Sequence, residues 1–151
     1  MEFLAKLHPL VIHFPIALLF FYILLEVSNI FINKDYLRNV SLFVLLLGVI
    51  GGVVAVLTGN QSLQMLEQNS NITRLHIRYI NNHEYFATIT LWYFFVILIV
   101  KIYLLKKKNY KQIFRYLFVI FVIGGGIILY QASKLGGKLV YSFGIGTDLL
   151  K

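Results

Sequence analysis

Histidine side chains are the strongest candidates for chemistry in this sequence of 151 residues. The chain has no cysteine, which excludes disulfides, iron–sulfur clusters and thiolate zinc sites. Histidine is the commonest metal ligand in proteins, and it also serves as an axial ligand of haem iron. The histidines precede or open two long apolar stretches, and this grouping predicts a metal or cofactor site. The candidate ligands are His8, His13, His76 and His83.

The spacing of these histidines limits which of them can face a common partner. His76 and His83 are seven residues apart, so they share a helix face if the helix begins well before the apolar stretch. His8 and His13 are five residues apart, which turns their side chains about 140° from one another on a straight helix. Pro15 removes a backbone hydrogen bond within the same helix, so we expect a bend just after His13 that re-aims both side chains.

Two charged residues lie within stretches that are otherwise apolar. Glu26 follows His8 by 18 residues. Lys101 follows His83 by the same number, which is five whole helical turns. An ion pair between Glu26 and Lys101 would neutralise two charges that are costly inside a membrane. This predicted buried pair places His8 level with His83 and puts His13 ~7.5 Å deeper.

The elements that must position these residues are helices that cross a membrane. Hydrophobic residues make up 59% of the chain and charged residues only 13%, whereas a soluble domain needs roughly 25% charged residues to cover its surface. Four apolar stretches each have about the 20 residues that span the hydrocarbon core. Short connections make neighbouring helices antiparallel, which predicts a single domain, an all-α integral membrane four-helix bundle with up-down-up-down topology. The helices are expected at about 9–32, 40–58, 85–105 and 113–131, with an outer loop at 59–84 in which residues 61–68 could extend the second helix.

Charge predicts how this bundle is oriented, because lysine and arginine in short loops accumulate on the cytoplasmic side. The end with both short connections carries Lys34, Arg38, Lys101, Lys106, Lys107, Lys108, Lys111 and Arg115 against Asp35 alone. At the opposite end, Glu2, Glu67, Glu84 and Asp148 offset Lys6, Arg74, Arg78, Lys134, Lys138 and Lys151. Both termini and the histidines are therefore expected on the periplasmic side of a bacterial cytoplasmic membrane. The net charge of +8 is read as a topology signal and not as a sign of nucleic-acid binding.

Glycines mark two of the predicted helices. Gly48 and Gly52 have a small-xxx-small spacing, and Gly124 to Gly126 form a run. Such residues favour close helix–helix approach. The alternative is that these helices become thin where a flat macrocycle passes between them.

The two ends of the sequence resemble a known family. The opening string LHPLVIHFPIALL and the closing string LGGKLVYSFGIG are similar to those of the bacterial membrane family called domain of unknown function 2231. The resemblance covers essentially the whole chain and implies four membrane helices. Because some relatives carry this module beside cytochrome c or Rieske-type domains, the resemblance also implies a redox setting. By position it matches His8, His13 and His83 to the family's histidines, while His76 has no counterpart.

Three functions from different classes follow from these features. The leading one is a b-type haem protein that passes electrons near the periplasmic face, with other membrane or periplasmic redox proteins as partners. His83 would be one axial ligand; the depth of the site favours His13 as the other, and the helix register favours His8. The runner-up is a cofactor-free accessory subunit of a larger membrane complex, which leaves an oligomer open.

The third function is a copper or zinc site made by His8, His13 and His83. The sequence contains no phosphate-binding glycine loop, nucleophile triad or carboxylate pair, so we do not expect a hydrolase or a transferase.

Overall fold

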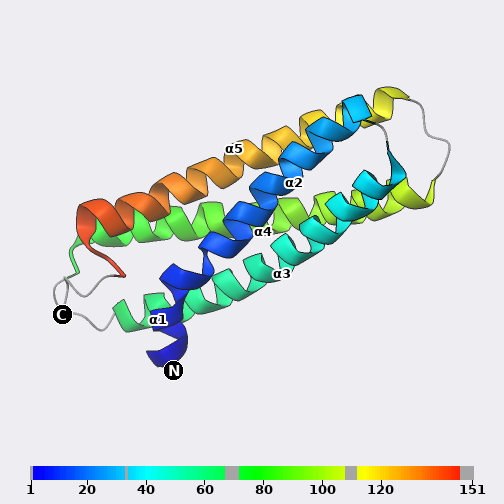
Figure 1. The fold of residues 1–151 in the computed structure, drawn as a ribbon. Coiled ribbons are helices and arrows are strands. Elements are labelled where there is room, and N and C mark those ends of the chain that lie inside the picture. The colour runs from blue at the N-terminus through cyan, green and yellow to red at the C-terminus, as the bar shows by residue number, and fades with distance from the viewer. Residues whose placement is uncertain (1, 33, 67–71, 108–111, 147–151) are drawn as a thin grey trace.

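The computed structural model of the protein describes residues 2–32, 34–66, 72–107 and 112–146. Within these ranges the regular secondary structure is entirely helical, and α2 to α5 run alongside one another in alternating directions (Figure 1). The predicted all-α four-helix bundle is confirmed. Its helices are α1 (Glu2–Val11), α2 (His13–Ile32), α3 (Asp35–Leu66), α4 (Arg74–Lys106) and α5 (Gln112–Phe143).

The outside of the bundle is suited to lipid. Large apolar side chains such as Phe31, Trp92 and Ile120 are exposed on its surface. An apolar surface of this extent is unfavourable in water, and lipid tails cover it without that cost. The segments that are long and apolar enough to cross a membrane are Leu7–Ile32, Asp35–Leu66, Arg74–Lys106 and Gln112–Phe143.

The helices extend beyond the apolar stretches that predicted them. Residues 59–66 belong to α3 and residues 74–84 belong to α4, so most of the predicted outer loop is helical. Likewise, α5 continues past position 131 to Phe143. An apolar run marks only the part of a helix that lies in hydrocarbon, whereas Gln, Leu, Met and Lys retain good helix propensity outside it.

The first membrane crossing is interrupted at Ile12, between α1 and α2. Pro15 has no N–H to donate to the carbonyl of Val11, which explains why the helix breaks one turn before the proline. The two parts therefore run in different directions, as Figure 1 shows. The expected bend is confirmed, but it lies before His13 and not after it. It places His8 on α1 and His13 on α2, so the angle expected for a straight helix does not apply.

The core of the bundle is packed closely around a few fully buried side chains. Tyr22, Leu45 and Phe94 are among them, and an edge-to-face contact joins the rings of Tyr22 and Phe94 at 6.4 Å. A Cβ atom on Gly48 would lie 2.6 Å from a methyl carbon of Leu19, so glycine at this position favours the close approach of α2 and α3. The predicted role of Gly48 in helix–helix approach is thus supported by its surroundings.

Candidate functional site

A cavity of about 450 Å³ lies between the helices at the end where α1 begins and α5 ends. Its volume is within the ~300–1,000 Å³ range of small-molecule and cofactor sites. Residues from all five helices line it, and most of them are apolar. Three of the four histidines, His8, His13 and His83, contribute to this lining. The structure therefore brings together side chains that are far apart in the sequence.

The ring of His83 is held by α5. Its Nδ1 lies 3.0 Å from the backbone carbonyl oxygen of Ala132. A carbonyl oxygen only accepts, so Nδ1 carries the proton and donates it. In the neutral ring, Nε2 then has the lone pair that a metal can use. The same ring packs on Gly136, where a Cβ atom would lie 3.0 Å from Cε1 of His83.

The ring of His8 is held by α3 in a similar way. Its Nδ1 lies 3.1 Å from Oγ1 of Thr58. The Thr58 hydroxyl has one proton, and it is directed at the carbonyl oxygens of Val54 and Ala55, each 3.0 Å away. Thr58 therefore accepts from His8, which again leaves the lone pair on Nε2. Gly59 supplies the surface under this ring, since a Cβ atom there would lie 3.0 Å from Cε1 of His8.

The two held histidines line the same cavity, and both rings are half-buried. His13 also lines the cavity, but its side chain is exposed at the start of α2. Among the residues that the structure describes, no group of three or more His, Cys, Asp or Glu side chains is arranged to hold a metal ion.

His76 has a different place from the other histidines. It is in the first turn of α4, where its backbone N–H donates to the hydroxyl of Thr73 at 3.5 Å. In return, Nδ1 of its ring accepts from the N–H of Thr73 at 3.3 Å. The ring also packs against Phe143 with 5.0 Å between centroids. These contacts cap α4 and join it to the end of α5, and His76 is not among the residues that line the cavity.

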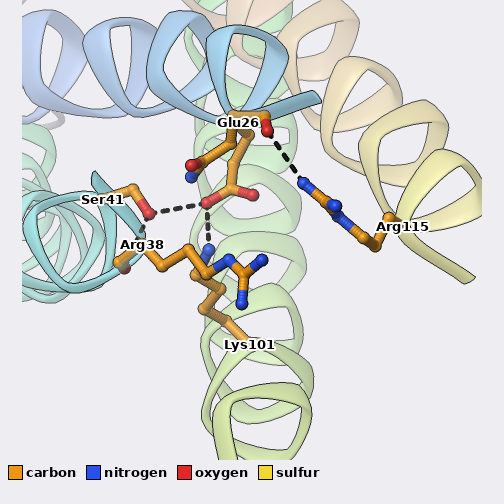
Figure 2. Close-up of polar contacts among 6 residues, drawn as sticks. Glu26, Arg38, Ser41, Lys101 and Arg115 are labelled. Atoms are coloured by element: carbon orange, nitrogen blue, oxygen red, sulfur yellow. Dashed lines mark hydrogen bonds and ion pairs between the residues drawn. The ribbon is translucent and has the colours of Figure 1, made fainter. Parts of the chain in front are cut away.

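The predicted buried ion pair is confirmed at the opposite end of the bundle. Nζ of Lys101 donates to Oε1 of Glu26, and both side chains are buried. The hydroxyl of Ser41 donates to the same carboxylate oxygen at 2.7 Å. Figure 2 shows Glu26 between these two donors, which come from α3 and α4. The pair fixes the register of α2 against α4, as the 18-residue spacings predict.

The groups that hold the histidines could not be identified from the sequence. Thr58 is the last residue of the predicted helix at 40–58, and Gly59 is the first residue of the predicted loop. Ala132 acts through its backbone oxygen, which no side chain reveals. The one available signal is the Gly136-Gly137 pair of the closing motif. Its meaning requires α5 to continue beyond position 131, because only then does Gly136 face His83.

A family model described as "Predicted membrane protein (DUF2231)" matches residues 5–149. No curated protein and no solved structure matches the chain.

Proposed function

Since the chain belongs to the DUF2231 family of predicted membrane proteins, we propose that it is a membrane-embedded b-type haem protein that passes electrons near one face of the membrane. The observation that carries the proposal is that two histidines in one cavity are held in the same tautomer. His8 and His83 line one cavity, and each ring donates its Nδ1 proton to the protein. This leaves Nε2 of each ring as the atom that could bind iron.

The residues around the cavity suit this cofactor. Haem needs a dry slot in which both axial ligands are oriented, and four-helix bundles commonly build such sites between facing helices. Gly59 and Gly136 leave room beside the two rings, where any larger residue would push on the imidazoles. Leu91, Phe94 and Leu129 are among the apolar side chains that would exclude water.

We assign the second axial position to His8 instead of His13. The ring of His8 has a hydrogen-bond partner and is half-buried. The side chain of His13 is exposed, so nothing described holds it in one orientation. The break at Ile12 is what separates the two, because it turns α1 toward α3.

The chemistry divides between cofactor and protein. A b-type haem supplies the one-electron Fe(III)/Fe(II) couple. Thr58 and Ala132 fix the tautomer and direction of the two imidazoles, and they strengthen the electron-donating character of each Nε2. The apolar lining keeps the surroundings at low polarity, which is one of the means by which a protein adjusts a redox potential.

The proposal includes a location in the bacterial cytoplasmic membrane with the histidines toward the periplasm. The basic residues support this orientation. Arg38, Arg115, Lys106 and Lys107 lie near the short connections, at the end of the bundle opposite to the histidines. Basic residues at this density mark the cytoplasmic side. Redox proteins of the membrane or the periplasm would then be the partners.

An optical spectrum of the detergent-purified protein tests the proposal. We expect a Soret band and the visible bands of six-coordinate haem, which shift on reduction with dithionite, at close to one haem per chain. If the protein has no Soret band as isolated and gains none on reconstitution with haem, the proposal is wrong.

Substitution of Gly136 gives a finer test of how His83 is held. A valine at position 136 would place Cβ 3.0 Å from the His83 ring and its methyl groups nearer still. We expect the Gly136→Val variant to bind haem at least about tenfold more weakly, as for other changes that disturb a ligand's orientation. Haem titration followed at the Soret band measures this.

Ser142→Val is the control, because it also introduces a valine into α5, at an exposed position that does not line the cavity. Haem affinity should stay close to that of the wild type. Equal losses in the two variants would contradict the role of Gly136 under His83.

Two other functions have observations in their favour. The apolar outer faces suit a cofactor-free accessory subunit of a membrane complex, and a stable partner that co-purifies in mild detergent would favour it. His13 lines the same cavity as His8 and His83, which favours a copper or zinc ion as the third candidate. Elemental analysis of the purified protein distinguishes that ion from haem iron.

A further inference from the structure

A second, small cavity lies among the buried polar residues at the basic end of the bundle. Its volume is about 30 Å³, which is room for roughly two water-sized groups. It lies next to the Glu26–Lys101 pair, about 27 Å along α4 from His83. That separation is close to the ~30 Å thickness of the hydrocarbon core. The cavity is therefore at the membrane boundary opposite to the histidines.

The lining of this cavity has more positive than negative charge. Lys101, Arg38 and Arg115 line it together with a single acidic residue, Glu26. Oε1 of Glu26 accepts from both Lys101 and Ser41.

The two arginines contact other groups as well. Nη2 of Arg115 donates to the backbone oxygen of Asn29 at 2.8 Å, which is a neutral acceptor. Nη1 of Arg38 lies 3.3 Å from Asp35, whose side chain is 93% exposed. In Figure 2 the guanidinium groups of Arg38 and Arg115 approach the space beside Glu26 from opposite sides.

A buried amide provides an independent sign that something binds here. Asn29 lines the cavity, and only 5% of its surface is exposed. Its Nδ2 and Oδ1 atoms are both buried, and neither has a partner among the described residues. A buried amide without a hydrogen bond is costly. Its two N–H groups are suited to an oxyanion, and its oxygen can accept from a water or from a protonated phosphate oxygen.

We propose that this cavity binds a phosphate group, supplied by the headgroup of an anionic lipid or by free phosphate. Arg38 and Arg115 provide charged, forked donors that match a phosphate, and Asn29 provides a neutral one. Basic pockets between membrane helices on the cytoplasmic side are suited to anionic headgroups. The cavity holds one or two phosphate oxygens, and the remainder of the headgroup lies outside it. This inference does not depend on haem.

Native mass spectrometry of the full chain in detergent tests the inference with defined probes. Short-chain phosphatidylglycerol, phosphatidylcholine and inorganic phosphate are added separately. We expect phosphatidylglycerol to bind at least about tenfold more tightly than phosphatidylcholine, because the choline ammonium group offsets the phosphate charge and is repelled by the arginines. Retention of phosphatidylglycerol alone identifies a lipid headgroup as the source. Comparable binding of inorganic phosphate identifies free phosphate.

Two substitutions and a control show whether binding uses this cavity. Arg115→Gln is expected to weaken binding of the preferred probe about tenfold. Asn29→Ala removes the unpartnered amide and no charge, and should weaken binding severalfold. Lys106→Gln is the control, because Lys106 is exposed in the last turn of α4 and does not line the cavity. Its affinity should equal that of the wild type.

Three results would overturn the inference. The first is that neither phosphatidylglycerol nor inorganic phosphate binds more tightly than phosphatidylcholine, which would mean that the cavity does not select an anionic phosphate. The second is that Lys106→Gln weakens binding as much as Arg115→Gln, which would mean that general surface charge attracts the probe. The third is that Asn29→Ala binds as the wild type does. Circular dichroism and gel filtration of each variant establish that it is folded.

Discussion

The His83→Ala variant is expected to lose haem, with affinity falling by more than about 100-fold. This exceeds the 10–100-fold effect of removing a group that only supports a ligand. The His83 ring donates its Nδ1 proton to Ala132 and so presents Nε2 as the donor atom. Removing the ring takes away that donor. The Soret absorbance per chain, after purification and after reconstitution with excess haem, is the measurement. The His8→Ala variant should behave in the same way.

Two other histidines provide controls for this experiment. His76 caps α4 and packs on Phe143, outside the cavity. His76→Ala should keep its haem and lose only a little stability, about 1 kcal/mol. His13→Ala should keep most of its haem, because the His13 side chain is exposed. If His13→Ala loses haem and His8→Ala keeps it, the second axial ligand has been assigned to the wrong residue.

Breaking the buried ion pair is expected to have the largest effect on stability. In Glu26→Gln, the ammonium group of Lys101 stays buried without an opposite charge, because its described hydrogen bond and ion pair both involve Glu26. Removing one partner of such a pair typically costs about 3–5 kcal/mol. The free energy of unfolding in mixed detergent micelles, titrated with sodium dodecyl sulfate, measures this change.

A double substitution separates the ion pair from other causes. Glu26→Gln with Lys101→Met removes both charges, and it should recover most of the stability that the single change loses. Asp35→Asn is the matched control, since the Asp35–Arg38 pair is exposed on the aspartate side and should contribute about 0–1 kcal/mol. A double variant as unstable as Glu26→Gln would show that the unpaired charge is not the cause.

The parts of the structure that follow from helical periodicity could be predicted from the sequence. The matching 18-residue spacings from His8 to Glu26 and from His83 to Lys101 predict the Glu26–Lys101 pair, which the structure contains. Periodicity works here because an interior charge needs a partner, and few partners are available in a membrane. The apolar stretches predict the existence and order of the membrane helices for the same reason: lipid allows few alternatives.

The remaining details depend on information that no sequence pattern carries. The choice between His8 and His13 depends on where the helix breaks, and the interruption falls at Ile12, one turn before Pro15. The ends of α3 and α5 depend on polar segments whose helical propensity is ordinary. The hydrogen bond from His83 to Ala132 depends on a backbone oxygen that every residue has.

The contacts of the two histidines also bear on how the bundle assembles. His8 is held by Thr58 within the α1–α3 hairpin, and His83 is held by Ala132 within the α4–α5 hairpin. The two hairpins are thus built alike. In each, the first arm carries the histidine, and the second arm carries the residue that accepts its hydrogen bond. A ligand bound by both imidazoles ties one hairpin to the other. By thermodynamic linkage, such a ligand at 100 times its dissociation constant adds about 2.7 kcal/mol to the docked state. Occupancy of the cavity would then decide how firmly the two halves of the protein stay together in the bilayer.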